Sequence, residues 1–146
     1  MTMTGPTHRE HPKPGNWREV ILEGRYAIKL PREERRAAAM CLNRWEREMW
    51  TVWRLQFGWQ HLCPVVWSDP DGQILIMQRA IQNVTAAEIE AISEAETHPC
   101  VTCEFKPVDW GRLEDGRVVV VDYGYTCDSE EEIMLQRAYY AEYIGF

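Results

Sequence analysis

The sequence lacks a long apolar run and has few basic residues for its number of acidic ones. No stretch approaches the roughly 18 consecutive apolar residues of a membrane-spanning helix, so we expect no membrane segment. The 16 Lys and Arg are outnumbered by 23 Asp and Glu, which gives a formal net charge of -7. Because general nucleic-acid binding depends on clustered cations, we expect no direct nucleic-acid partner. This acidity is typical of an ordinary solvated surface and also suits a basic partner.

The first residues also lack the apolar segment of a secretion signal. Residues 1–15 contain three Pro, two Gly and two His, which predicts a flexible leader followed by one domain over residues 16–146. A chain of 146 residues, 45% of them hydrophobic, has enough apolar surface for one core. The cysteine count is five, an odd number, and with the missing signal it favours reduced thiols in the cytoplasm over a disulfide framework.

Short β-prone runs flank glycine-containing turns at three places and predict three hairpins. The expected strands cover residues 20–22 and 26–28, 64–67 and 73–77, and 113 with 117–121. Helices are expected at 32–57, where apolar residues recur at steps of three or four, at 85–96, which opens with a Thr85–Glu88 capping box, and at 129–142. This order predicts an α+β fold with an antiparallel sheet and one long helix.

The segment from Glu104 to Gly124 carries polar residues at a regular spacing. Residues 104–109 read E-F-K-P-V-D and residues 122–124 read D-Y-G, with Lys106, Asp109 and Asp122 at plus two, plus five and plus 18 from Glu104. The first run resembles the catalytic-loop pattern D-L-K-P-x-N of protein kinases, and the second resembles their metal-binding D-F-G. The resemblance implies that Glu104 and Lys106 stand at catalytic positions, and that Asp109 and Asp122 stand at the Mg²⁺ positions.

A second part of the resemblance lies upstream. Residues 26–29 read Y-A-I-K and resemble the strand motif V-A-I-K, whose lysine contacts ATP phosphates and pairs with a glutamate of the next helix. The resemblance therefore implies nucleotide contacts for Lys29, with Glu48 as its partner 19 residues on. Glu46 is the alternative partner, on a different side of the same helix. The resemblance also implies that Met77 stands near the gatekeeper position of the nucleotide site, with residues 78–80 as the hinge.

Three departures from the kinase pattern predict a reduced domain without catalysis. No glycine-rich loop precedes Lys29 to cover nucleotide phosphates. Thr102, Cys103 and Glu104 stand where the family has His, Arg and Asp, and the longer arm of glutamate shifts the carboxylate. Only 22 residues follow Gly124 (146 minus 124), too few for the large helical lobe. We therefore expect a minimal kinase-like domain with a truncated C-lobe and a C-terminal helix, similar to small kinase-like accessory proteins of bacteriophages.

The favoured interpretation of function is binding without catalysis. A phage or mobile-element accessory protein of this kind is expected to act on a host or phage protein complex, for example as an inhibitor of a host defence complex such as a CRISPR effector. Such binding requires no cofactor. The alternative is a Mg-ATP-dependent phosphotransferase or nucleotide-binding protein whose site a partner completes, with Lys29, Glu48, Glu104, Asp109 and Asp122 retained.

A third interpretation is a small zinc-binding module. Cys100 and Cys103 have C-x-x-C spacing, and His61 with Cys63 adds an H-x-C pair that would complete four tetrahedral ligands. One C-x-x-C motif without a second is more often a pair of buried free thiols, so zinc is not the expected cofactor. The thiols of the motif also occupy the start of the kinase-like catalytic loop, so the two interpretations exclude one another there.

Overall fold

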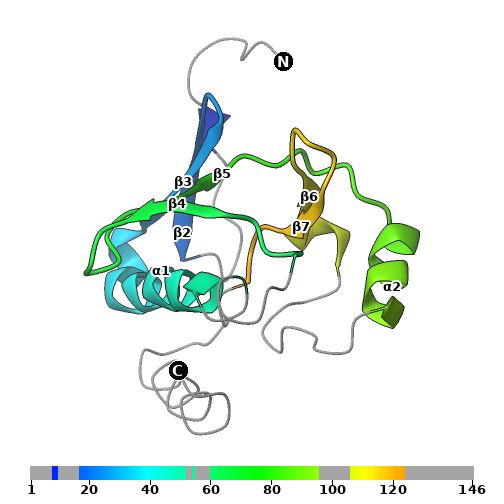
Figure 1. Ribbon diagram of the computed structural model, residues 1–146. Coiled ribbons are helices and arrows are strands. Elements are labelled where there is room, and N and C mark those ends of the chain that lie inside the picture. The colour runs from blue at the N-terminus through cyan, green and yellow to red at the C-terminus, as the bar shows by residue number, and fades with distance from the viewer. Residues whose placement is uncertain (1–7, 10–16, 52–53, 55–59, 96–105, 124–146) are drawn as a thin grey trace, which may run out of the picture.

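The computed structural model describes residues 8–9, 17–51, 54, 60–95 and 106–123 (Figure 1). Its main sheet is antiparallel and contains, in spatial order, β2 (Arg18–Glu23), β3 (Tyr26–Pro31), β5 (Leu75–Gln78) and β4 (Val65–Ser68), with the short strand β1 (His8–Arg9) beside β2. A second sheet pairs β6 (Trp110–Arg112) with β7 (Val118–Val120). Within the described residues, the helical elements include α1 (Arg36–Met49), α2 (Ala86–Ala95) and the 3-10 turns Glu33–Arg35 and Pro107–Asp109.

Each hairpin turns at a glycine with a positive φ, as the turn sequences predicted. Gly24 (φ 57°) joins β2 to β3, and Gly116 (φ 91°) joins β6 to β7. Residues with a Cβ rarely adopt this backbone region. Gly72 (φ 83°), in the β4–β5 turn, is required for a second reason, because an added Cβ would lie 2.3 Å from the carbonyl oxygen of Met40. This close approach seats the turn directly on α1.

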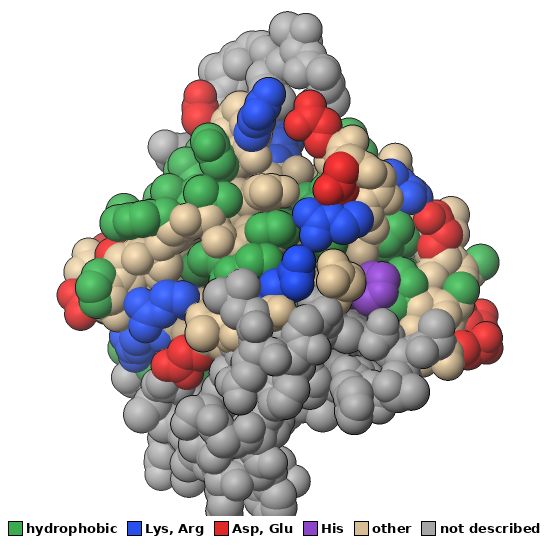
Figure 2. Space-filling model, viewed as in Figure 1, with side chains coloured by type: hydrophobic (Ala, Val, Ile, Leu, Met, Phe, Trp, Pro, Cys, Tyr) green, Lys and Arg blue, Asp and Glu red, His purple; other side chains and the backbone are tan. Residues whose placement is uncertain are grey.

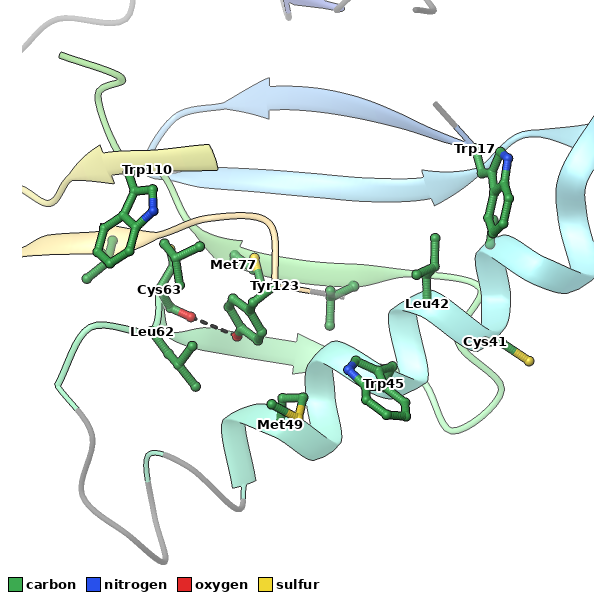
Figure 3. Packing of buried hydrophobic residues seen from close by; sticks show 14 of the residues in the cluster. Trp17, Cys41, Leu42, Trp45, Met49, Leu62, Cys63, Met77, Trp110 and Tyr123 are labelled. Carbon is green, nitrogen blue, oxygen red and sulfur yellow. Dashed lines mark hydrogen bonds between the residues drawn. The ribbon is translucent and has the colours of Figure 1, made fainter. Parts of the chain in front are cut away.

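Helix α1 covers one face of the main sheet and supplies much of the core (Figures 1 and 3). Its buried apolar positions recur at steps of three or four residues, which is the pattern of one helical face. They include Ala38, Leu42, Trp45 and Met49. These positions confirm an apolar stripe within the helix predicted at 32–57, of which α1 is the α-helical part described here.

Helix α2 begins at the predicted capping box. The Thr85 hydroxyl accepts the backbone N–H of Glu88 at 3.2 Å, and the Glu88 carboxylate accepts the backbone N–H of Thr85 at the same distance. None of the helices in the described ranges is both long enough and apolar enough to cross a membrane.

The β6–β7 hairpin is fastened to the segments that flank β4 and β5. Leu62, just before β4, forms a parallel bridge with Val120, and Ile81, just after β5, forms an antiparallel bridge with Arg112. Trp110 of β6 is fully buried beneath this junction (Figure 3). The two sheets therefore share one hydrophobic core.

The structure confirms a mixed α+β fold with an antiparallel sheet and one long helix. The helix expected at 129–142, and with it the chain beyond Tyr123 where we expect a truncated C-lobe, lies outside the described residues. Within the expected leader at 1–15, His8–Arg9 pair with Leu22 and Ile21 of β2 as the short strand β1. The physical reason is that the edge of β2 offers unpaired backbone groups with which a passing segment can form hydrogen bonds.

Candidate functional site

A network of charged side chains lies between α1 and the main sheet, and we define this core ion network as Arg18, Lys29, Glu46 and Asp122. Glu46 is fully buried, and both of its carboxylate oxygens accept hydrogen bonds. Arg18 Nη1 donates to Oε1, and Lys29 Nζ lies 3.1 Å from each oxygen. The backbone N–H of Tyr123 donates to Oε2 at 2.9 Å. This set of donors compensates for the loss of water around the carboxylate.

Asn43 extends the network from the helical turn before Glu46. Its Oδ1 accepts from Arg18 Nη1 at 3.1 Å. Its Nδ2 donates to the backbone carbonyls of Lys29 at 3.2 Å and Gly72 at 2.8 Å. Asn43 is fully buried, so this amide ties β2, β3 and the β4–β5 turn to α1.

The ammonium of Lys29 meets three acceptors inside the protein. Besides the two Glu46 oxygens, Nζ lies 2.6 Å from the carbonyl oxygen of Val121. A lysine ammonium has three hydrogens to donate, so the acceptors match the donors in number. The Lys29 side chain is only 6% exposed. Lys29 thus acts as a buried cross-link between β3, α1 and the end of β7.

Asp122 and Tyr123, the first two residues of the D-Y-G run, lie against the same network. Asp122 Oδ1 accepts from Arg18 Nη2 at 3.0 Å, and the Asp122 side chain is 46% exposed. The backbone N–H of Val121 donates to the carbonyl of Asp109 at 2.7 Å, which brings the turn before β6 next to the end of β7. The fold thus brings Lys29 and Asp122 into the core ion network, and it brings the backbone of Asp109 next to Val121. The carboxylate of Asp122 nevertheless contacts Arg18. The carboxylate that contacts Lys29 belongs to Glu46 of α1.

The helix carboxylate that contacts Lys29 is Glu46, which corrects the sequence-based choice of Glu48. The two residues lie two positions apart, about 200° around a helix, so they point to different sides. Glu46 is on the side that faces β3 and is fully buried, whereas Glu48 is partly exposed. Counting residues to the kinase spacing selected the wrong side of the helix.

Electrostatics keep Glu46 ionised. Burial alone raises the pKa of its carboxyl, but the nearby cations Arg18 and Lys29 and the hydrogen bonds from Arg18 and Tyr123 outweigh it and lower that pKa to about 2. For the thiol of Cys63, burial outweighs the nearby charges and raises the pKa to about 12. Its thiol stays protonated at neutral pH and donates to the Gln78 carbonyl at 3.1 Å.

The other residues predicted from the kinase resemblance lie outside the core ion network or outside the described residues. Met77 is buried in the core at 1% exposure, opposite Ala27 of β3. Lys106 is exposed, and its backbone carbonyl accepts from the N–H of Asp109 at 2.9 Å. Glu104 lies outside the described residues.

The proposed zinc ligands are described only in part, since Cys100 and Cys103 lie outside the described residues. His61 Nδ1 lies 3.0 Å from the carbonyl oxygen of Val118, which fixes the ring against β7. Among the residues that the structure describes, no three His, Cys, Asp or Glu side chains gather to hold a metal ion. In the part of the chain that the structure describes, the His61 ring and the Cys63 thiol each contact a backbone carbonyl oxygen.

A groove opens on the opposite face of the main sheet. Tyr26 precedes Lys29 by three residues, so strand alternation directs its side chain to the face away from α1. Its register partner is Gln78, and both line a cavity of about 520 Å³. We call this cavity the hairpin groove, because it lies between the β2–β3 and β6–β7 hairpins; its lining includes Arg25, Tyr26, Val66, Arg79, Ile81 and Arg112. Figure 2 shows hydrophobic and Lys or Arg side chains side by side on this face.

Sequence reasoning did not identify this groove. Its arginines come from a turn, a loop and a strand, at positions 25, 79 and 112, and no periodic pattern connects them. Only the pairing of the segment after β5 with β6 brings them together.

A scan against protein-family models and searches among curated proteins and solved structures found no match to this chain. The kinase-like resemblance is therefore an interpretation of motifs and their spacing.

Proposed function

We propose that this protein is a non-catalytic, kinase-like binding protein that acts by protein–protein interaction. In this proposal, the residues that resemble kinase motifs hold the fold together, and a surface contacts the partner. The resemblance to phage accessory proteins suggests a host defence complex, such as a CRISPR effector, as the partner.

One observation supports binding over phosphoryl transfer: the cation that would hold a nucleotide phosphate is already saturated. Lys29 contacts the two Glu46 oxygens and the Val121 carbonyl within 3.1 Å and is nearly inaccessible to solvent. To reach a phosphate, Lys29 would have to give up one of these three acceptors, which would leave a buried oxygen without its donor. A buried acceptor left unsatisfied costs about 1–3 kcal/mol. That cost opposes nucleotide binding at this site.

A nucleotide-dependent enzyme completed by a partner is the second candidate. Lys29, a helix carboxylate and Asp122 do lie together, which is the arrangement that the kinase-like alternative requires. Asp122 is also nearly half exposed, so a Mg²⁺ ion could approach it. In that case Mg-ATP is the cofactor, and binding must rearrange the contacts of Lys29.

Thermal unfolding of the full chain with and without millimolar Mg-ATP distinguishes the two candidates. A ligand present at 100 times its Kd stabilises the folded state by about 2.7 kcal/mol, which shifts the Tm by several degrees. We expect an unchanged Tm and no ATP turnover. A rise of several degrees, or measurable hydrolysis, would show that the nucleotide alternative is correct.

The variant Lys29→Met serves as the matched control for that experiment. If Lys29 is structural, the variant unfolds at a lower temperature without any nucleotide, and Mg-ATP changes neither protein. If Lys29 binds phosphate, the wild-type protein responds to Mg-ATP and the variant does not. The difference between the two responses reports on the site independently of the stability loss.

A further inference from the structure

We infer that the hairpin groove binds an acidic, extended segment of a partner protein that presents apolar side chains between its carboxylates. This inference rests on the proposed binding function and adds the surface and the chemistry of the partner.

The charge of the groove is opposite to that of the whole chain. Arg25, Arg79 and Arg112 line it together with one acidic residue, Glu114, whereas the chain carries a net charge of -7. Arg112 Nη2 donates to the Glu88 carboxylate at 2.6 Å, so this guanidinium is oriented by α2. The lining therefore has three arginines and one glutamate, Glu114, and Glu88 adds a second carboxylate beside Arg112. A negatively charged segment is therefore attracted to this surface, and a positively charged one is not.

The groove also gathers exposed apolar side chains. Tyr26, Val66 and Ile81 are 44%, 48% and 51% exposed, and all three line the groove. They come from β3, from β4 and from the segment after β5, so the apolar surface extends across three elements. A small anion would contact the arginines and leave these side chains in water. In an extended segment every second side chain faces the same way, so a segment with acidic and apolar residues in alternating pairs presents both kinds of side chain to the groove.

The floor of the groove is held by backbone hydrogen bonds. The N–H of Arg79 donates to the carbonyl of Arg25 at 2.7 Å, which joins the β2–β3 turn to the segment after β5. Ile81 and Arg112 exchange two further hydrogen bonds, at 2.9 and 2.8 Å. A site fixed in this way loses little conformational freedom when a partner binds.

The direct test uses a synthetic 12-residue peptide in which pairs of Glu alternate with pairs of Val, labelled with a fluorophore, and a matched peptide with Lys in place of each Glu. Binding to the full-length protein is followed by fluorescence anisotropy at low ionic strength. We expect the Glu peptide to bind at least roughly tenfold more tightly than the Lys peptide, and added salt to weaken it. Equal affinities, or no binding of either peptide at millimolar concentration, would overturn the inference.

Three charge variants locate the binding on the protein. Arg25→Glu should weaken the Glu peptide by roughly threefold or more, and Glu114→Arg should tighten it by a similar factor. Arg36→Glu makes the same change of charge as Arg25→Glu on α1, where Arg36 pairs with Glu33 at an exposed position, and should leave the affinity nearly unchanged. Equal losses for Arg25→Glu and Arg36→Glu would indicate attraction to net charge alone and would contradict a specific groove.

A second copy of the chain could also occupy the groove. Analytical ultracentrifugation of the protein alone tests for this self-association. A dimer that Arg25→Glu dissociates would show that the groove is a self-association surface and would overturn the inference of a separate partner. If neither peptide binds and Mg-ATP leaves the Tm unchanged, the groove is not the binding surface. The proposed binding function would then still hold. A nucleotide response removes the proposed function itself.

Discussion

The two faces of the main sheet use arginine in opposite ways. On the face covered by α1, Arg18 is buried and donates to Glu46, Asn43 and Asp122. On the other face, Arg25 is exposed and lines the hairpin groove. The side chain is the same, but its surroundings decide its role. A cation enclosed with its acceptors becomes part of the fold, whereas one that faces solvent can attract a partner.

The largest effect should come from Glu46→Ala, which leaves Arg18 and Lys29 buried without their shared counter-ion. We expect a loss of about 3–5 kcal/mol in the free energy of unfolding, measured by urea denaturation. Glu48→Ala is the matched control, because it removes a partly exposed carboxylate from the same helix; a loss below about 1 kcal/mol is expected there. Similar losses for the two variants would remove the distinction between the buried face and the surface.

Acid should destabilise the fold through the core ion network. The folded protein holds the pKa of Glu46 near 2, below its ordinary value of 4.5, so the unfolded chain takes up this proton first as the pH falls. The stabilisation is therefore complete above about pH 5 and is lost progressively towards pH 2, by a few kcal/mol.

Urea denaturation at a series of pH values measures this loss, and Glu46→Gln provides the reference. The variant has no proton to gain at this position, so its stability should fall less between pH 5 and pH 2 than that of the wild-type protein. Parallel curves for the two proteins would mean that Glu46 does not carry the acid sensitivity.

An intermediate effect is expected at Gly111, where β6 meets the segment after β5. A Cβ at this position would lie 2.7 Å from the Cβ of Ala80 and 3.2 Å from the carbonyl oxygen of Ile81. Gly111→Ala should therefore cost about 1–3 kcal/mol, as overpacked core positions do. The double variant Ala80→Gly with Gly111→Ala should recover part of the loss in the same denaturation experiment. No recovery would mean that the two positions do not share this contact.

The smallest effect on stability should come from the groove. Arg25→Ala removes an exposed turn side chain, and surface substitutions of this kind change the free energy of unfolding by about 0.5 kcal/mol or less. The same denaturation assay measures it. A loss comparable to that of Glu46→Ala would place Arg25 among the structural cations and end the contrast between the two faces.

Local signals in the sequence accounted for the hairpins and the capping box. Gly24 and Gly116 mark turns that require a positive φ, and Thr85 with Glu88 satisfies the first amides of α2, so a few neighbouring residues were sufficient. Local sequence signals could not predict which glutamate pairs with Lys29. Glu46 and Glu48 are the same residue type on one helix, and only the packing of α1 on β3 selects between them.

The sequence by itself determined the order of the three hairpins and of helices α1 and α2, and motif spacing singled out Lys29 and Asp122, which share the core ion network. These features depend on turn chemistry, residue periodicity and motif spacing, all of which are written along the chain. Tertiary structure alone decided that Lys29 is enclosed by Glu46 and Val121, and that three distant arginines line one groove. The reason is physical: burial and charge balance arise only when separate segments meet, and they determine whether a charged side chain is structural or remains on the surface.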